Sequence, residues 1–285
     1  MCRVMGVSQS GYYAWRRRLT EPPRVRRKTL SQLVTNCYWE NRRRYGSRRI
    51  KAALNKSGIK VGRFIIRRLM NEENLKAIAP KRFTPKTTDS KGTHAAPNLL
   101  AEINLDQCAA GKIIVGDITY LALLSGKWCY LAVWQDKVTR RIIGWSLSDS
   151  MTAALVISAL KKAISLRLVR AGAIIHSDQG SQYAAGEFRQ LLQTSCFRQS
   201  MSGKGNCYDN AQAESFFSRF KAELIESGVF ESVEQARSEV FSYIEGYYNR
   251  VRLHSGLGYK SPMEFELELK IENGGRKESF HSTFT

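Results

Sequence analysis

The sequence has 285 residues, of which 43% are hydrophobic, and its 45 Lys/Arg outnumber its 25 Asp/Glu for a formal net charge of +20. No run approaches the ~18 consecutive apolar residues of a transmembrane helix, and the first residues lack the apolar core of a signal peptide, so we expect neither a membrane protein nor a secreted one. The six cysteines and four histidines are scattered, with no Cys-x-x-Cys pair, which disfavours a zinc site and favours free thiols in a reducing compartment.

The positive charge is concentrated at the front of the chain. Residues 1–90 hold 23 Lys/Arg and 5 Asp/Glu, a net charge of +18, whereas residues 91–285 hold 22 and 20, a net charge of +2. A segment this cationic attracts phosphate backbones through counterion release. A solvated surface or a patch for anionic membranes is the alternative, but no amphipathic anchor or lipidation motif lies beside it, so nucleic acid is the favoured partner.

The front of the chain is predicted to be helical. We expect a helix over residues 29–44, a second from Ser47 that closes at Ser57-Gly58, and a third in VGRFIIRRLM (61–70), with Ile66, Leu69 and Met70 on one side. Two short helices joined by a glycine-containing turn fit a helix-turn-helix, although other helical hairpins share this pattern. Residues 80–100 are rich in Pro, Thr, Ser and Lys without a period, which predicts a linker and a domain boundary.

Strands dominate the next part of the chain. KIIVGDITY (112–120), KWCYLAVWQD (127–136) and RRIIGWSLS (140–148) are predicted strands, and they are followed by a helix over 151–169. AIIHSD (173–178) is the next strand and GEFRQLLQTS (186–195) a short helix. A meander followed by a crossover helix and another strand predicts an α/β fold with a sheet of mixed direction.

Two aspartates end strands that should be neighbours. The crossover helix should lay the 173–178 strand parallel to the first strand, so Asp117 and Asp178 would emerge side by side at the edge where such sheets carry their chemistry. Two carboxylates at close range repel, and a hard divalent cation relieves that repulsion. Glu214, on a predicted helix that Asp209 would cap, is a third oxygen ligand. Taken singly, each of the three carboxylates has a structural explanation as a strand end, a turn or a solvated helix residue.

The spacing and four local motifs carry a family resemblance. Asp117, Asp178 and Glu214 are separated by 60 and then 35 residues, and this resembles the Asp-Asp-35-Glu triad of DDE transposases and retroviral integrases. The stretches GDITY, HSDQGSQY, SMSGKGNCYDNAQAESFFSRFKAEL and YYNRVRLHSGLGYKSPMEFE are similar, in order, to the second-reading-frame product of the bacterial insertion-sequence-three family. The resemblance runs from about residue 3 to residue 266, so it covers nearly the whole chain.

The resemblance implies a ribonuclease H-like mixed sheet flanked by helices, preceded by a small all-α helix-turn-helix-like domain. It implies a basic helical DNA-binding region over 1–79, a linker over 80–100, an integrase-like catalytic core with C-terminal helices over 101–266, and a tail over 267–285. The implied activity is divalent-metal-dependent cleavage of DNA 3′ ends and strand transfer, with two Mg²⁺ (or Mn²⁺) ions held by Asp117, Asp178 and Glu214.

The resemblance also suggests partners and DNA contacts. The partners would be double-stranded DNA at element ends and target, further copies of the chain, and the upstream reading-frame product, whose helix-turn-helix and zipper segment this chain is expected to lack. The setting would be the bacterial cytoplasm at the nucleoid. Lys221 lies seven residues after Glu214 on the same helix face, where it could hold a phosphate, with a solvated lysine as the alternative. The expected DNA contacts are Lys221, Arg63, Arg67, Arg48, Arg49, Lys204, Arg250 and Arg252.

Several residues in these motifs leave alternatives open. His176 and Gln179 flank a predicted ligand, and buried packing is as good an interpretation of His176 as a direct role. Asn249, Arg250, Arg252 and His254 are expected to be structural or DNA-contacting rather than catalytic.

The sequence also departs from the family pattern. Phe64 and Ile65 stand where family members commonly show more basic residues, which questions base reading by the 61–70 helix. Gly203 stands where the related loop often carries arginine, which would weaken one DNA contact without touching the metals. The rival functions are a catalytically silent, transposase-derived DNA-binding regulator and a general metal-dependent nuclease.

Overall fold

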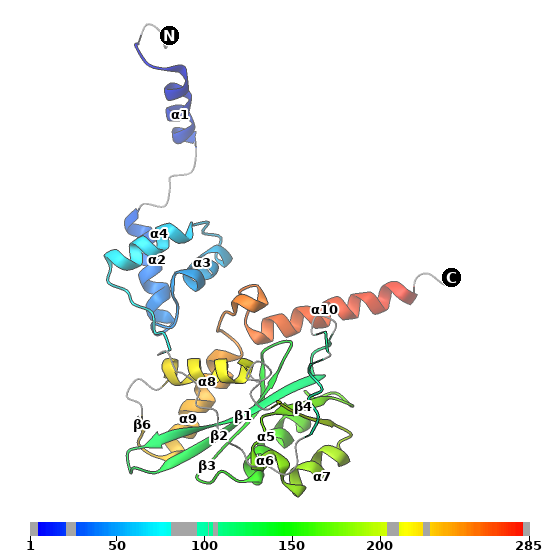
Figure 1. Ribbon diagram of the computed structural model, residues 1–285. Coiled ribbons are helices and arrows are strands. Elements are labelled where there is room, and N and C mark those ends of the chain that lie inside the picture. Colours follow the sequence, from blue (N-terminus) through cyan, green and yellow to red (C-terminus); the bar gives the residue numbers. More distant parts are fainter. Residues whose placement is uncertain are drawn as a thin grey trace. The chain divides into compact units, whose positions relative to one another are not determined.

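The structure is a computed structural model that describes residues 5–20, 27–80, 96–101, 103–104, 108–203, 211–224 and 229–281, with the side chains of 17–20 and 273–281 excepted. The chain divides into two compact units, Met1–Ile78 and Ala79–Thr285 (Figure 1). Most of the predicted linker, residues 81–95, lies outside the described residues. No helix in the described ranges combines the length and the apolar character that a membrane crossing requires.

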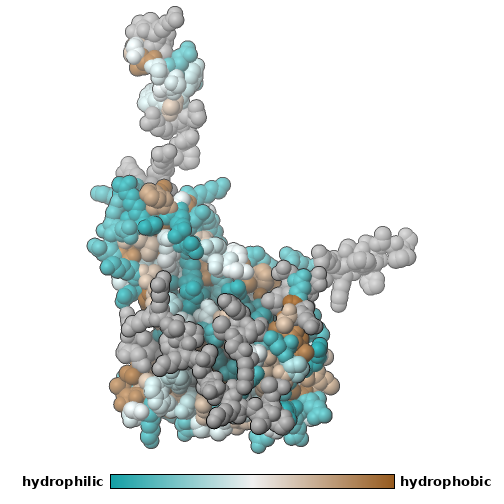
Figure 2. Space-filling view, in the orientation of Figure 1, coloured by the Kyte–Doolittle hydropathy of each residue, from teal (hydrophilic) through white to brown (hydrophobic). Residues whose placement is uncertain are grey.

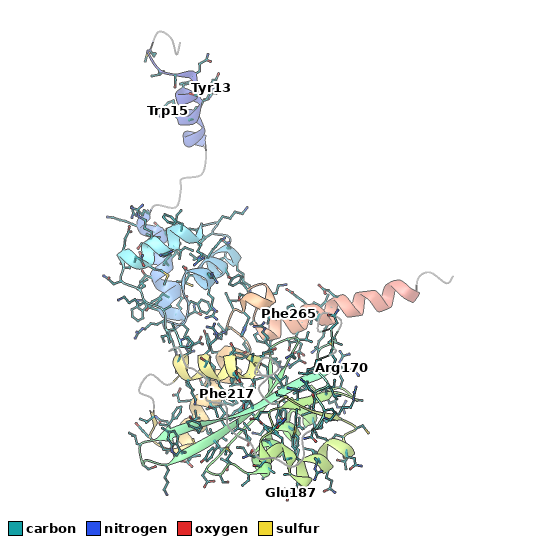
Figure 3. All side chains as sticks on the ribbon, in the orientation of Figure 1. Tyr13, Trp15, Arg170, Glu187, Phe217 and Phe265 are labelled. Atoms are coloured by element: carbon teal, nitrogen blue, oxygen red, sulfur yellow. The ribbon has the colours of Figure 1, made fainter. Side chains whose placement is uncertain are left out.

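The first unit is helical. Its helices are α1 (Gln9–Thr20), α2 (Arg27–Glu40), α3 (Ser47–Lys56) and α4 (Arg63–Glu72), and α2, α3 and α4 pack against one another. Their buried positions repeat at helical spacing, namely Leu30, Val34, Cys37, Tyr38, Ile50, Leu54, Ile66, Leu69 and Met70. The side chains of Tyr13 and Trp15 project from α1 into solvent (Figure 3).

The first predicted helix of this unit was too long. It ends at Glu40 rather than at residue 44, because Arg42 and Arg43 adopt positive φ angles of 49° and 63°, a backbone conformation that stops a helix. The Tyr38 hydroxyl donates to the Lys76 carbonyl at 2.7 Å, and the Ile78 N–H donates to the Arg43 carbonyl at 2.9 Å. These bonds tie the end of the unit back to the turn after α2.

The second unit is built on a six-stranded mixed sheet. Its strands are β1 (Ile113–Leu123), β2 (Trp128–Asp136), β3 (Ile142–Ser148), β4 (Ile174–Ser177), β5 (Arg198–Met201) and β6 (Val229–Phe230). The order is β3-β2-β1-β4-β5, and β6 pairs with the far end of β1. β1, β2 and β3 form an antiparallel meander, whereas β4 and β6 run parallel to β1 and β5 runs parallel to β4. The predicted mixed sheet is therefore confirmed.

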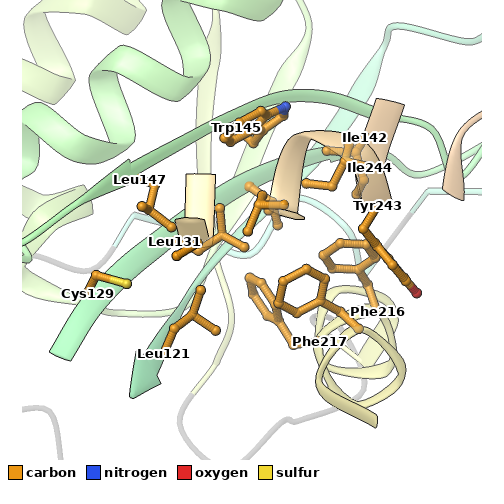
Figure 4. Close-up of a cluster of buried hydrophobic side chains, with 14 of the residues drawn as sticks. Leu121, Cys129, Leu131, Ile142, Trp145, Leu147, Phe216, Phe217, Tyr243 and Ile244 are labelled. Carbon is orange, nitrogen blue, oxygen red and sulfur yellow. The ribbon is translucent and has the colours of Figure 1, made fainter. Parts of the chain in front are cut away.

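Helices cover both faces of this sheet (Figure 1). The first face packs on α5 (Ala153–Ser165), α6 (Ser181–Ala184) and α7 (Gly186–Thr194). The opposite face packs on α8 (Ala211–Leu224), α9 (Val233–Phe241) and the π-helical segment η2 (Ser242–Tyr248). Figure 4 shows Phe216 and Phe217 of α8 directed at Leu121 and Leu131 of the sheet. This packing holds α8 beside β1.

Two strand glycines have a packing reason. A Cβ on Gly116 would lie 2.3 Å from the Trp134 ring, and a Cβ on Gly144 would lie 2.2 Å from the Ala159 carbonyl oxygen. The first glycine makes room for Trp134, whose ring stacks on Phe188 with centroids 5.8 Å apart. The second lets α5 approach β3 closely. The absence of a side chain at Gly116, the residue before Asp117, therefore lets β1 pack closely against Trp134.

The C-terminal part of the described chain is also helical. After η2 come a short 3₁₀ turn, η3 (Ser255–Leu257), and α10 (Pro262–His281). Helix α10 continues through most of the region 267–285 that was expected to be a tail. Glu266, on α10, accepts from Arg141 and Lys270, in each case at 2.6 Å, so its first turns are anchored to the sheet side of the unit.

Candidate active site

Asp117 lies on β1, and Asp178 directly follows β4, the parallel strand beside it. The last registered pair of β1 and β4 is Val115 with His176. β4 ends one residue before Asp178, and the Asp178 carboxylate lies near enough to Asp117 to raise the pKa of Asp117. β4 ends at Ser177, but β1 continues to Leu123 because it stays paired with β2. The expectation that Asp117 ends its strand was therefore wrong: it lies in mid-strand, at the level where the neighbouring strand stops.

The surroundings of both aspartates disfavour negative charge. Burial, together with the nearby Asp178 and Glu214 carboxylates, raises the pKa of Asp117 to about 8. The Ile118 N–H, 2.8 Å from Asp117 Oδ1, and the Lys221 ammonium act in the opposite direction. Burial also raises the pKa of Asp178. The Gly180 N–H, which donates to its Oδ1 at 3.0 Å, has the smaller, opposite effect of lowering it.

Helix α8 carries Glu214 and Lys221 to the same region. Glu214 is solvent-exposed in the first turn, and its charge acts on Asp117. Lys221 is half-buried, with its Nζ 4.3 Å from the centroid of the Tyr120 ring. Desolvation lowers the pKa of Lys221, and the Asp117 carboxylate opposes that shift. The α8 residues and the two aspartates therefore share one electrostatic environment.

The donor chemistry of this site suits a hard cation only in part. Asp117 and Asp178 supply carboxylate oxygens whose mutual repulsion a divalent ion relieves. Within the ranges that the structure describes, however, no three His, Cys, Asp or Glu side chains lie close enough together to hold a metal ion. The structure thus brings the two aspartates together and leaves Glu214 within electrostatic range rather than at a shared coordination point.

His176 is held by a strand that the sequence did not predict. β5 runs beside β4, and the fully buried His176 ring has Nδ1 at 2.8 Å from the Ser200 hydroxyl and Nε2 at 3.1 Å from the Ser202 hydroxyl. Gln179 donates to the Ser202 carbonyl at 3.0 Å. These contacts favour a positioning role for His176 in the turn that carries Asp178. The sequence of β5 (Arg198–Met201), RQSM, is short and mostly polar, so it gave little signal for a strand.

The expected DNA contacts differ in exposure. Arg48, Arg63 and Arg67 in the first unit and Arg250 in the second are exposed. Arg49 is half-buried, donates to the Arg44 carbonyl at 3.2 Å and lies over the Tyr45 ring. Lys204, like the predicted cap Asp209, lies outside the described residues.

The expectation that Arg252 contacts DNA was wrong. Its side chain is fully buried, with the residue only 1% exposed, and it forms a two-point ion pair with Glu223 of α8 at 2.7 and 3.0 Å. The Tyr243 hydroxyl donates to the same carboxylate at 2.9 Å. This burial excludes a direct Arg252–DNA contact. Asn249 is likewise structural, because its side chain exchanges two 3.0 Å hydrogen bonds with the backbone of Ile142 on β3.

Comparison with known proteins identifies the family. Two family profiles described as "Integrase core domain" match residues 108–207 and 195–262, and one described as "HTH-like domain" matches residues 25–83. Transposase InsF for insertion sequence IS3A of Escherichia coli (strain K12) is 38% identical over 270 residues, covering 93% of this chain and 92% of that protein. The chain belongs to the IS3 family of transposases.

A second curated relative agrees with this assignment. The transposase for insertion sequence element IS904 of Lactococcus lactis is 40% identical over 243 residues, covering 85% of this chain and 95% of that protein. Among solved structures, the catalytic core domain of BIV integrase is 17% identical with a TM-score of 0.41, covering 57% of this chain and 98% of that one. The HTLV-2 integrase catalytic core domain in complex with magnesium is 18% identical with a TM-score of 0.40, covering 55% and 97%.

Membership of the IS3 family confirms the fold expectation. The integrase core coincides with the mixed sheet and its flanking helices, and the helix-turn-helix-like region precedes it. DNA transposition is the function of the family, and this chain combines its integrase core with a helix-turn-helix-like domain.

Proposed function

We propose that this IS3-family chain performs divalent-metal-dependent cleavage of DNA 3′ ends followed by strand transfer. The observation that supports the proposal is the electrostatic interaction of Asp117 on β1 with Asp178, which follows the neighbouring parallel strand β4, and with Glu214 and Lys221 of α8. Negative charge concentrated at a partly buried position costs free energy unless a cation accompanies it. A site whose carboxylates are only partly offset by a positive charge, that of Lys221, is suited to binding metal ions, and bound metal ions can in turn bind phosphates.

Each residue has a distinct part in this proposal. Asp117, Asp178 and Glu214 would hold Mg²⁺ (or Mn²⁺), two ions in all, which when bound would activate the attacking oxygen and stabilise the leaving one. Lys221, seven residues beyond Glu214 on α8, would hold a phosphate next to the reacting bond. His176, through Ser200 and Ser202, would keep the turn that carries Asp178 in place.

The remaining assignments follow from the same proposal. Residues 1–79 would bind double-stranded DNA, residues 101–266 would carry the chemistry, and 80–100 would connect them. The chain would act as a homo-oligomer on element ends and target, with the upstream reading-frame product as a further partner. Since the substrate is bacterial DNA, the place of action would be the cytoplasm at the nucleoid.

Isosteric substitution of the three carboxylates tests the proposal. Asp117→Asn, Asp178→Asn and Glu214→Gln should each lower Mg²⁺-dependent cleavage and joining of end-containing oligonucleotides by at least ~100-fold. Asp149→Asn, at an exposed carboxylate just past β3, is the matched control and should retain activity. Near-normal activity in any of the three would remove that residue from the site.

The same assay separates the rival functions. A DNA-binding regulator would bind the ends with neither cleavage nor joining, in the wild-type chain and in all variants. A general metal-dependent nuclease would cleave without forming joined products.

A further inference from the structure

Helix α4 presents an unusual solvent face. Its buried side consists of Ile66, Leu69 and Met70, and because successive helical residues turn by ~100°, Phe64 and Asn71 lie on the opposite side. Phe64 is 78% exposed, more than any other large apolar side chain in the described ranges. Ile65 beside it is 48% exposed. Folding of the three-helix core therefore gives no reason for an aromatic residue at this position.

Basic residues lie close to this aromatic residue along the helix. Arg63 and Arg67 are exposed on the same helix, one residue before and three residues after Phe64. The space-filling view shows a predominantly hydrophilic surface over α2, α3 and α4 (Figure 2). An apolar protein partner is poorly matched by such a rim, because charged residues are depleted at the centres of protein interfaces. A polyanion with apolar groups in a groove matches it better.

The position of Phe64 in the helix pair points to the same ligand. α3 and α4 form two helices joined by the turn 57–62, and Phe64 is the second residue of the second helix. In a helix-turn-helix, the N-terminal residues of the second helix reach base edges in the major groove. The apolar group presented there is the thymine 5-methyl, and phenylalanine is one of the side chains that contact it.

We propose that Phe64 contacts thymine 5-methyl groups in the major groove of the element end and thereby contributes to sequence recognition. Arg67 and Asn71 stand on the same exposed side and are the residue types that pair with guanine and adenine. Phe64 on this side of α4 then means a preference for thymine rather than lost base reading. The proposal rests on the proposed binding of element ends but not on the proposed chemistry.

Replacing thymine by deoxyuridine tests the contact, because it removes the methyl group alone. The preferred duplex is first selected from a random library with the full chain, and each thymine is then replaced in turn. One or two replacements should weaken wild-type binding about fourfold each, the cost of one exposed methyl. Phe64→Ala should bind the selected duplex more weakly by a similar factor, should no longer respond to those replacements, and should bind unrelated duplexes as the wild type does.

Matched controls make the outcome decisive. Trp39→Ala removes another exposed aromatic of the same unit, 57% exposed at the end of α2, and should keep the full response to deoxyuridine. Phe64→Leu, which keeps an apolar contact, should keep part of it. No preferred sequence in the selection, no response of the wild type to any replacement, or an equal response in Phe64→Ala would each overturn the proposal. A change in oligomeric state in Phe64→Ala with unchanged binding to the selected duplex would overturn it in favour of a protein contact. Triad variants should bind the selected duplex normally, so failure of the catalytic proposal would be recognised separately.

Discussion

Asp117 is the residue at which burial and charge conflict most directly. Its carboxylate sits in mid-strand, its pKa is raised to about 8 by burial and by Asp178 and Glu214, and Lys221 offsets this only in part. A protein gains no stability from such a group while it is ionised without a counter-charge. This conflict points to a function, because strongly shifted pKa values are concentrated at sites that bind ions or perform catalysis.

The raised pKa of Asp117 predicts a pH dependence in the metal-free chain. Because the folded state holds the proton more tightly than the unfolded chain, stability should fall as pH rises from the ordinary value of 3.8 to about 8 and then level off. Asp117→Asn should abolish this part of the slope and be more stable by about 1–3 kcal/mol at pH 8, a range reduced for partial solvent access. Urea unfolding in EDTA between pH 5 and pH 9 measures both.

Mg²⁺ supplies the complementary measurement. It should stabilise the wild type more at pH 8 than at pH 5, since binding requires deprotonated ligands. Parallel pH profiles for the wild type and Asp117→Asn would contradict the assignment of this slope to Asp117.

Lys221 should act on DNA rather than on the fold. Lys221→Gln removes one charge beside the proposed reacting phosphate, so binding of element ends and joining should fall about tenfold, the value of one charge-assisted hydrogen bond. The melting temperature should change little, because the lysine is only half-buried and its aliphatic part can be replaced by glutamine. Lys161→Gln, on the exposed side of α5, is the control. Equal losses in the two variants would indicate general electrostatics.

At the scale of elements, α8 joins the site to the C-terminal part of the chain. Its first turn carries Glu214, its phenylalanines pack on the sheet, and its last turn holds Glu223, which pairs with the buried Arg252. A buried ion pair is costly to break from one side, because the remaining charge is left without a partner. The orientation of α8, and with it that of Glu214 and Lys221, therefore depends on residues almost thirty positions further along the chain.

Breaking that pair should be strongly destabilising. Glu223→Gln leaves the Arg252 guanidinium buried without a counter-charge and should lower the free energy of unfolding by about 3–5 kcal/mol. Glu268→Gln, which removes the half-exposed pair of Lys260 and Glu268, should cost at most about 1 kcal/mol. The double variant Glu223→Leu/Arg252→Met should recover much of the loss. Urea titrations of the full chain compare the free energies of unfolding of these three variants. Similar losses in Glu223→Gln and Glu268→Gln would argue against the role of the Glu223–Arg252 pair in holding α8.

On the scale of the whole molecule, the positive charge is concentrated outside the part that matches the integrase core. The basic surplus belongs to residues 1–90, with a net charge of +18, whereas the part with the integrase core is nearly balanced at +2. The proposed catalytic carboxylates thus lie in the unit with little surplus charge, and the first unit would supply most of the attraction to phosphates. Specificity for element ends would then come from the few side chains that reach base edges.

Salt dependence tests this division. Binding of the full chain to an unrelated duplex should fall by roughly 10³-fold between 50 and 200 mM salt if at least six phosphates are contacted. A chain lacking residues 1–78 should bind more weakly and show a much shallower slope of log affinity against log salt. Fluorescence anisotropy on a labelled duplex measures both slopes, and equal slopes would place the phosphate contacts in the second unit instead.

Much of the architecture was readable from local sequence. The helical spacing of Ile66, Leu69 and Met70 and the β-branched and aromatic runs of the meander predicted elements within a few residues of their observed ends. The position of Asp178 directly after a buried strand was also predicted correctly. These features depend on interactions between residues near in sequence, so period and turn chemistry suffice to identify them.

Only the tertiary structure decided how far β1 extends past Asp117, that Ser200 and Ser202 hold His176, and that Arg252 is buried against Glu223 rather than facing DNA. Each of these depends on a partner more than twenty residues away or on pairing with another strand. An arginine in a basic chain has the same local signal whether it is paired with a phosphate or with a carboxylate inside the fold. The choice between them is made by which segments pack together, because packing determines which charges lose their water and must find a partner within the protein.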